Sequence, residues 1–172
     1  MKRIFVWPRL AARRLLVACL AFLLCLGCGT GVAIAQDGTV NYNGTDLVER
    51  DLSDTDFIRT TFVNANMKRT NFHKSRLMGA TLTRGYLEEA DLSDTDLTAA
   101  LLDRTSLVRA NLKNANLTAA IITSTTWEEA DIEGADFTDA ILNREAIVYL
   151  CSYASGTNPT TGIDTRESLG CK

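Results

Sequence analysis

The stretch ADLSD-TDLTA-ALLDR-TSLVR-ANLKN-ANLTA, residues 90–119, decides the fold of this 172-residue chain. Every fifth residue is large and apolar, and the same period continues without a break from Leu47 to Leu142. These central residues are Leu47, Leu52, Phe57, Phe62, Met67, Phe72, Leu77, Leu82, Leu87, Leu92, Leu97, Leu102, Leu107, Leu112, Leu117, Ile122, Trp127, Ile132, Phe137 and Leu142. Two residues before each of them the side chain is small, with Arg50 the one exception. A fixed short period is typical of a solenoid.

A period of five excludes an ordinary helix or a flat strand. Five helical residues rotate each apolar side chain about 140° from the last, so no common face forms. In a flat strand an odd period sends successive apolar residues to opposite faces. A chain that turns by the same amount at each repeat points every central residue at one axis, and small neighbours leave room for it.

The repeats resemble a known family. Units such as Ala90–Asp94, Ala110–Asn114 and Ala115–Ala119 are similar to the Ala-(Asp/Asn)-Leu-X-X motif of pentapeptide-repeat proteins. The resemblance implies an all-β solenoid, a right-handed quadrilateral β-helix with 20 residues per coil. The repeats from 46 to 143 then make about five coils, and a strand spacing of roughly 4.8 Å gives a rod near 24 Å long.

The first 35 residues predict a cleaved export signal. Five basic residues precede an uncharged run from Leu15 to Ala35, which ends in the small-x-small pattern Ala33-Ile34-Ala35. An uncleaved membrane anchor and lipidation at Cys28 remain open. Removing residues 1–35 takes away five of the 18 basic residues and none of the 21 acidic ones, so the net charge changes from −3 to −8.

Two cysteines, Cys151 and Cys171, remain after such cleavage. A pair of cysteines in an exported domain predicts a disulfide rather than a metal site, because no second pair and no nearby histidine accompany them. Thiol–disulfide regulation through the pair is an alternative. No cofactor and no metal are expected.

Both ends of the repeat region have flanking segments that are expected to cover exposed strand edges. Residues 36–45 predict a short N-terminal cap strand. Residues 144–172 predict a C-terminal cap of two helices joined by the disulfide, the first from Arg144 to Ala154 after Asn143, and the second opened by Asp164 and ended by Gly170. The stretch Gly156-Thr157-Asn158-Pro159 separates them.

The C-terminal tail resembles one subgroup of this family. Gly156-Thr157-Asn158-Pro159 and Thr165-Arg166-Glu167-Ser168-Leu169-Gly170-Cys171 are similar to the C-terminus of thylakoid-lumen pentapeptide-repeat proteins of cyanobacteria and chloroplasts. This implies a lumenal location, with the periplasm second. It implies lumenal protein partners, photosynthetic complex components among them, and membrane contact only through an uncleaved signal. It implies neither a nucleic-acid partner nor a particular oligomeric state.

Three outward surfaces follow when residues 20 apart are stacked. A charge ladder alternates sign along Glu49, Arg69, Glu89, Arg109 and Glu129. A basic band with no acidic residue between 57 and 87 is a candidate docking surface for an acidic lumenal protein, against ordinary solvation. Its six members are Arg59, Lys68, Arg69, Lys74, Arg76 and Arg84.

The third surface is an apolar stripe. Leu101, Ile121 and Ile141 stand immediately before central residues, where a polar residue is usual, and are 20 apart. They predict a partner or self-association site, unless the tail or the N-terminal segment covers them or they merely suit the strand.

The chemical inventory argues against an enzyme. His73 is the only histidine, and phosphate loops or nucleophile elbows are missing from the sequence. The many Asp and Asn residues fit turns, where short polar side chains bond local backbone. We therefore expect a non-enzymatic lumenal interaction scaffold. The alternative is a DNA-mimic inhibitor of a type II topoisomerase, the role of other pentapeptide-repeat proteins.

Overall fold

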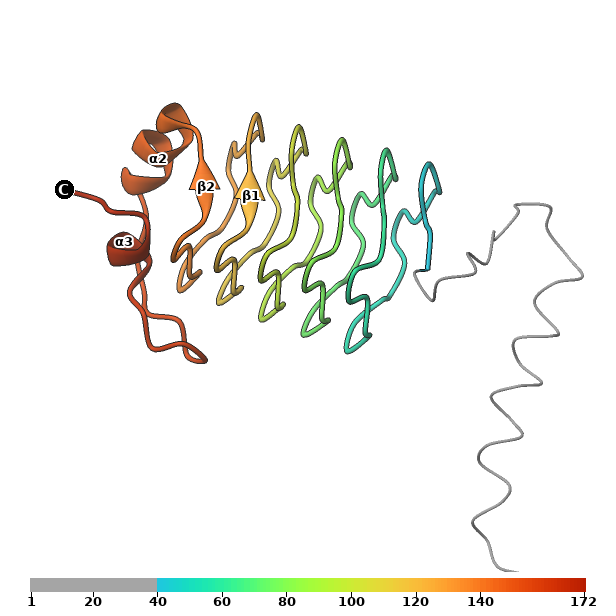
Figure 1. Ribbon diagram of the computed structural model, residues 1–172, viewed down its shortest axis with the longest axis horizontal. Coiled ribbons are helices and arrows are strands. Elements are labelled where there is room, and N and C mark those ends of the chain that lie inside the picture. Colours follow the sequence, from blue (N-terminus) through green and yellow to red (C-terminus); the bar gives the residue numbers. More distant parts are fainter. Residues whose placement is uncertain (1–39) are drawn as a thin grey trace, which may run out of the picture. The chain divides into compact units, whose positions relative to one another are not determined.

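The computed structural model describes residues 40–172, in which the chain winds into stacked coils (Figure 1). Parallel bridges join residues 20 apart, from Asn41–Thr61 to Asn116–Asp136. Strands β1 (Ile121–Ile122) and β2 (Ile141–Leu142) pair in the same register, with Ile121 opposite Ile141. This is the 20-residue coil that the resemblance implies, and residues 41–140 form five such coils.

Four faces result, each a stack of repeats. The first face stacks the repeats centred on Leu47, Met67, Leu87, Leu107 and Trp127, and the second, third and fourth faces follow at five-residue steps. Most inter-coil pairing consists of isolated bridges, and only β1 and β2 are assigned as strands among the described residues. The expected all-β solenoid therefore contains little regular strand, because each side of a coil has only a few residues between turns.

The turns at the corners share one backbone conformation. The residue two places after each central residue has a positive φ, between 50° and 72°, at every repeat from Glu49 to Asp139. The Asp or Asn before a central residue accepts the amide that leads into this turn, as when Ser93 N–H donates to Asp91 Oδ1 at 3.0 Å. These side chains compensate part of the cost of the left-handed conformation, and they explain why Asp and Asn recur without forming an acidic site.

The interior is a column of apolar side chains. The central residues from Phe57 to Phe137 are buried, most of them completely. Small residues lie beside them, and the threonines among these donate inward: Thr105 Oγ1 bonds to Leu82 O at 3.0 Å. Leu47 and Leu52 are only half-buried, and Tyr42 stacks on Phe62 there with ring centroids 5.1 Å apart.

The coil begins earlier than predicted. Asn41 bridges Thr61, and Tyr42 N–H donates to Thr61 O at 2.7 Å. Residues 41–45 therefore form a repeat with Tyr42 at its centre, and the described part of the expected cap strand 36–45 belongs to the first coil. The physical reason is that a single aromatic residue can occupy the central position as well as leucine. The remainder of that segment and the export signal 1–35 lie outside the described residues.

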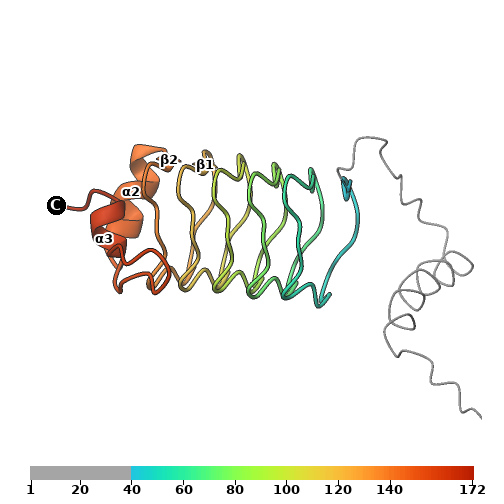
Figure 2. The same ribbon diagram turned by 60° about the horizontal axis from the view of Figure 1, so that its bottom comes forward.

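The C-terminal segment folds over the last coil (Figure 2). Helix α2 spans Arg144–Cys151, shorter than the predicted 144–154, and helix α3 spans Thr165–Ser168. Asp164 caps α3 by accepting the Arg166 and Glu167 amides. Asn143 stands at the N-cap of α2, but its side chain does not cap the helix and instead donates to Glu145 Oε2 at 3.0 Å. Neither helix is long and apolar enough to cross a bilayer.

Candidate functional site

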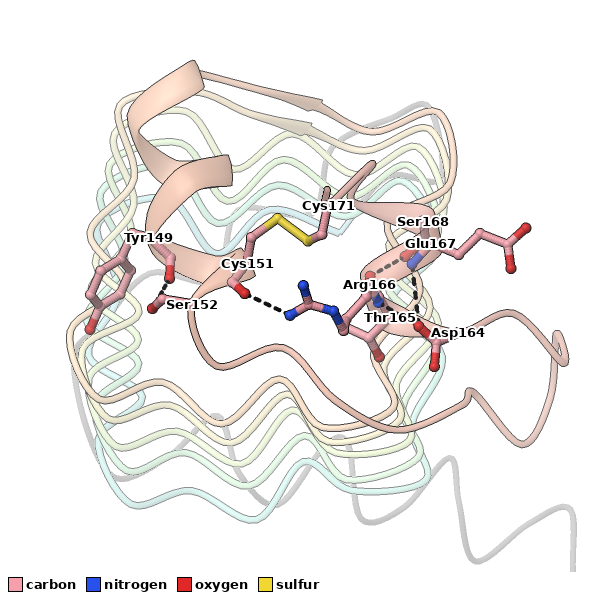
Figure 3. The surroundings of a disulfide bond; sticks show 9 residues. All are labelled: Tyr149, Cys151, Ser152, Asp164, Thr165, Arg166, Glu167, Ser168 and Cys171. Atoms are coloured by element: carbon pink, nitrogen blue, oxygen red, sulfur yellow. Dashed lines mark hydrogen bonds between the residues drawn. A yellow bond between two sulfur atoms is a disulfide. The ribbon is translucent and has the colours of Figure 1, made fainter.

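The two cysteines lie together in the cap (Figure 3). Cys151 ends α2 and Cys171 follows α3, and a disulfide joins them across a sequence separation of 20 with Cα atoms 5.5 Å apart. Arg166 Nη1 donates to Cys151 O at 2.8 Å, so the second helix also bonds the end of the first. Sulfur atoms bonded to each other do not offer thiolates to a metal ion. The pair therefore holds the two helices together in this structure.

Asn158 fixes the cap to the coils, a role that the sequence did not reveal. It is fully buried, and its Nδ2 donates to Asn114 O at 3.0 Å, Ala115 O at 3.3 Å and Gly134 O at 2.9 Å. Its Oδ1 accepts the Thr160 and Thr161 amides. The amide thus satisfies carbonyls of the last two coils and orders the tail at once. The sequence offered only a turn signal at this position.

A glycine pair allows the tail to approach. Gly134 N–H donates to Ser155 O at 2.8 Å, and a Cβ added to Gly156 would lie 2.8 Å from Gly134 N. Gly156 also has a φ of +87°. Only glycine fits at this contact without displacement of backbone, which explains its place in the tail.

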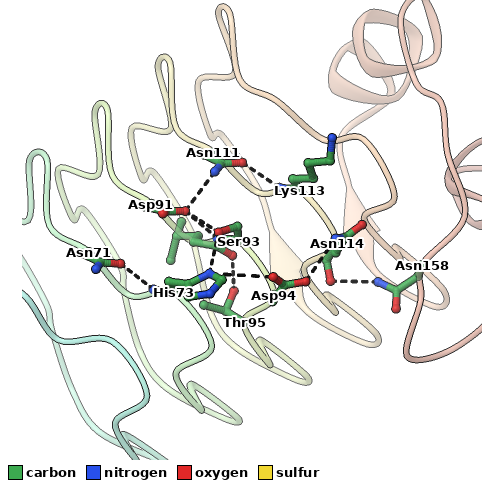
Figure 4. Close-up of polar contacts among 11 residues, drawn as sticks. Asn71, His73, Asp91, Ser93, Asp94, Thr95, Asn111, Lys113, Asn114 and Asn158 are labelled. Carbon is green, nitrogen blue, oxygen red and sulfur yellow. Dashed lines mark hydrogen bonds and ion pairs between the residues drawn. The ribbon is translucent and has the colours of Figure 1, made fainter.

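The only histidine belongs to a polar column on the second face (Figure 4). His73 Nδ1 lies 2.9 Å from Ser93 Oγ and 3.8 Å from Asp94 Oδ2, while Ser93 Oγ donates to Asp91 Oδ1 at 2.6 Å. A catalytic triad needs the serine and the carboxylate on opposite ring nitrogens. Here both lie on one nitrogen and the serine proton is already donated to Asp91, so these residues connect coils and do not form a nucleophile.

Half of the predicted basic band is paired with carboxylates of neighbouring coils. Arg69 bonds Glu49 at 2.7 Å, Arg76 bonds Asp56 at 2.9 Å, and Lys68 lies 3.8 Å from Glu88. No ion pair is formed within residues 40–172 by Arg59, Lys74 and Arg84, which lie on the third, second and fourth faces. The basic band therefore stays a prediction as a docking surface, and three of its six cations are engaged by carboxylates of neighbouring coils.

Charge is organised by coil instead. The net charges of residues 41–60, 61–80, 81–100, 101–120 and 121–140 are −3, +4, −4, +2 and −6, with His73 neutral. Every ion pair between coils joins a basic coil to an acidic neighbour, including Arg109 to Glu89 at 2.6 Å and Lys113 to Glu133 at 2.6 Å. The predicted ladder is one column of this pattern, and its pairs Glu49–Arg69 and Glu89–Arg109 are formed.

Hydrogen bonds within the ion pairs between coils shift the pKa values of the side chains that form them. The Arg109 guanidinium donates to Glu89 and holds the pKa of that carboxyl below its usual value, and Glu133 raises the pKa of Lys113 in the same way. Exposed pairs of this kind contribute little to stability. They favour one stacking order of coils over others, since like-charged coils would repel.

The apolar stripe is present on the fourth face. Leu101 pairs with Ile121 and Ile121 with Ile141, in a column whose earlier members Thr61 and Thr81 are polar. Ile121 is 40% exposed and Ile141 is 56% exposed. The C-terminal tail therefore does not cover the stripe, and that alternative was wrong. Cover by the segment before residue 40 lies outside the described residues.

Comparison with known proteins settles the family. The model for pentapeptide repeats matches residues 43–84 and 90–126 with eight copies. The crystal structure of a pentapeptide repeat protein from the thylakoid lumen of Arabidopsis thaliana is 39% identical and covers 76% of this chain and 91% of that one, with a TM-score of 0.75. The chain belongs to the pentapeptide-repeat family. Membership implies the right-handed quadrilateral β-helix expected from the repeat.

Two further relatives carry less weight. Thylakoid lumenal protein TL20.3 of the Arabidopsis thaliana chloroplast is 77% identical over 22 residues, and the match spans 13% of this chain and 8% of that protein. QnrB1, a plasmid-mediated fluoroquinolone resistance protein, is 17% identical over 59% of this chain and 72% of its own, with a TM-score of 0.27. The latter likeness is too low to carry an argument about function.

Proposed function

We propose that this pentapeptide-repeat protein is a non-enzymatic binding scaffold of the thylakoid lumen, with the periplasm as the second location. The observation that carries the proposal is its 39% identity to a thylakoid-lumen protein across 91% of that protein's structure. The predicted export signal is consistent with such a location. The structural use of His73 and of the recurrent Asp and Asn residues supports binding rather than catalysis.

The apolar stripe is the part of the scaffold that we assign to a partner protein. The column of half-buried Leu101 and exposed Ile121 and Ile141 is costly to leave in water, and such patches commonly mark interfaces. Arg59, Lys74 and Arg84, which form no ion pair with residues 40–172, lie on three different faces and offer no comparable patch. Partners among photosynthetic complex components fit the proposed location.

Affinity capture from isolated thylakoid lumen tests this role. Full-length protein should retain specific lumenal proteins, and Ile121→Asp should lose them because a charge interrupts the stripe. Thr81→Asp adds the same charge two coils earlier in the same column and should retain them. Retention of one set of proteins by all three, or of none, would contradict the proposal. Concentration-independent sedimentation of wild type and Leu101→Asp as monomers would exclude self-association through the stripe.

The charge pattern weighs against the DNA-mimic alternative. A mimic of B-form DNA needs a continuous acidic surface, whereas the second and fourth coils carry net charges of +4 and +2. The residues that produce these charges are paired mainly with neighbouring coils, so they alternate with the acidic ones along the whole rod. A gyrase supercoiling assay checks this directly, and inhibition by the protein would reverse our choice.

Regulation through the disulfide is the remaining alternative. Cys151 and Cys171 are both partly exposed, so a reductant has access to them. We assign the bond a structural role because it joins the two helices of the cap. Reduction that changes partner retention in the capture experiment, without unfolding the coils, would favour regulation instead.

A further inference from the structure

The last coil leaves one edge of the first face open. In the preceding coil, Leu107 N–H donates to Thr126 O at 3.0 Å and Arg109 N–H donates to Glu128 O at 2.8 Å. Trp127 and Glu129 occupy the same two positions one coil later, and their N–H groups have no acceptor within residues 40–172. The reason is that the chain turns into α2 at Arg144 and does not continue the sixth coil that β2 begins.

The other three faces are treated differently by the cap. On the second face Gly134 N–H bonds Ser155 O, on the third Phe137 N–H bonds Ser168 Oγ at 3.0 Å, and on the fourth β2 pairs with β1. Each of these edges receives at least one bond from the chain that follows it. The first face thus keeps two backbone donors without an acceptor among residues 40–172, at Trp127 and at the turn residue Glu129. A free strand edge of this kind is a template for pairing with another chain.

A cleft of about 220 Å³ lies beside this edge. Thr126, Trp127 and Glu128 of the last coil form one side, and Glu145, Ala146 and Tyr149 of α2 belong to the other. The indole of Trp127 is buried, and its Nε1–H has no partner. Buried indole N–H groups ordinarily find an acceptor, so this donor is an unsatisfied polar group in the interior of the last coil.

The charged side chains that line the cleft are all acidic. Its lining contains the carboxylates of Glu128 and Glu145 and has no Lys, Arg or His. The Asn143 side chain donates to Glu145 Oε2 at 3.0 Å and holds that carboxylate in place. Tyr149 and Trp127 supply aromatic rings beside the two carboxylates. Carboxylates next to aromatic rings suit a Lys or Arg side chain, which gains from both.

We propose that this cleft binds an extended peptide segment carrying a Lys or Arg residue, which adds to the first face as one further strand. Alternate carbonyls of the segment accept the N–H groups of Trp127 and Glu129, and its cationic side chain lies against Glu128 and Glu145. Strand addition supplies affinity through the main chain, and the side-chain pocket supplies selectivity. The site is on a different face from the apolar stripe, so loss of the stripe's partner would leave this proposal intact.

Nuclear magnetic resonance titration of the full-length, ¹⁵N-labelled protein tests the site. A Trp7→Phe background leaves Trp127 as the only indole signal. The probe is the peptide acetyl-Thr-Val-Lys-Val-Thr-amide, with the Lys→Glu peptide and acetyl-lysine-amide as controls. We expect the probe to shift the Trp127 indole and the Trp127 and Glu129 amides. The Lys→Glu peptide should bind about tenfold more weakly, as expected for the loss of one favourable charged contact.

Matched variants locate the effect. Glu128→Gln and Glu145→Gln should each weaken binding of the probe severalfold, whereas Asp139→Asn removes the same charge from the third face of the last coil and should not. Absence of shifts at millimolar probe overturns the proposal. Equal shifts with acetyl-lysine-amide also overturn it, because they indicate a site for a small amine. Shifts that depend on protein concentration without probe do so too, because they indicate a second copy at the edge.

Discussion

Leu107 and Trp127 occupy the same position on the same face, one coil apart, and they differ in what lies beyond them. The N–H of Leu107 is bonded to the following coil, whereas that of Trp127, a residue lining the cleft beside α2, has no acceptor within residues 40–172. Their local backbone is alike, since Arg109 and Glu129 have φ values of 55° and 58°. The comparison shows that the repeat determines the backbone conformation at both positions. Whether a backbone N–H remains available to a partner depends instead on where the repeats end.

The largest difference between the two regions should appear in the core. Leu102 is fully buried in the fourth coil, while Leu142 at the end of the coils is only partly buried. We expect Leu102→Ala to lower the free energy of unfolding by about 2–5 kcal/mol, because it leaves a cavity that neighbouring coils cannot fill. Leu142→Ala should cost clearly less. Urea denaturation measures both losses of stability. Equal losses would contradict an interior that is less well packed at its end than in the fourth coil.

Removal of the disulfide should rank next. Opening the loop between Cys151 and Cys171, with a sequence separation of 20, should cost about 3 kcal/mol on the chain-entropy model. We expect the Cys151→Ser/Cys171→Ser variant to lose amide protection first at Gly134, where the tail bonds the last coil, and last in the second coil. Hydrogen exchange followed residue by residue distinguishes this from a uniform loss of protection, which would contradict a role limited to the cap.

Asn158 should give a smaller effect. Asn158→Ala leaves Asn114 O and Gly134 O without their donor, while Ala115 O keeps the Asp136 N–H, and we expect a loss of about 1–3 kcal/mol in the free energy of unfolding. Asn143→Ala is the matched control, because it removes an exposed amide of the same segment that bonds only Glu145. That variant should stay within about 0.5 kcal/mol of wild type. A similar change in both variants would show that Asn158 does not anchor the cap.

Prediction from sequence succeeded where the repeat itself decides the outcome. The interior column and the 20-residue coil follow from the apolar period and the family motif, and the capping role of Asp164 follows from its spacing to Glu167. The pairing of three cations of the basic band was not predicted, because their partners lie 20 residues away in the neighbouring coils. Asn158 and the open edge at Trp127 depend on how the tail crosses the last coil, and no local pattern encodes that path.

The smallest effect should come from the exposed pair of Arg109 and Glu89. Because the folded-state pKa of Glu89 is lowered, the pair stabilises the fold above the usual glutamate pKa, and this contribution is lost as the pH falls through the lowered value. Arg109→Ala should return the pKa of Glu89 towards its ordinary range and barely change the urea midpoint. A carboxyl titration by nuclear magnetic resonance measures the shift. An unchanged pKa of Glu89 would show that the two side chains do not pair in solution.

Amide hydrogen exchange at four residues of the first face tests the central claim most directly. Leu107 and Arg109 should exchange slowly, because the last coil accepts their N–H groups. Trp127 and Glu129 should exchange much faster and become protected when the Lys-containing peptide is added. Equal protection of all four amides in the free protein would mean that the edge is already closed, and would contradict the account.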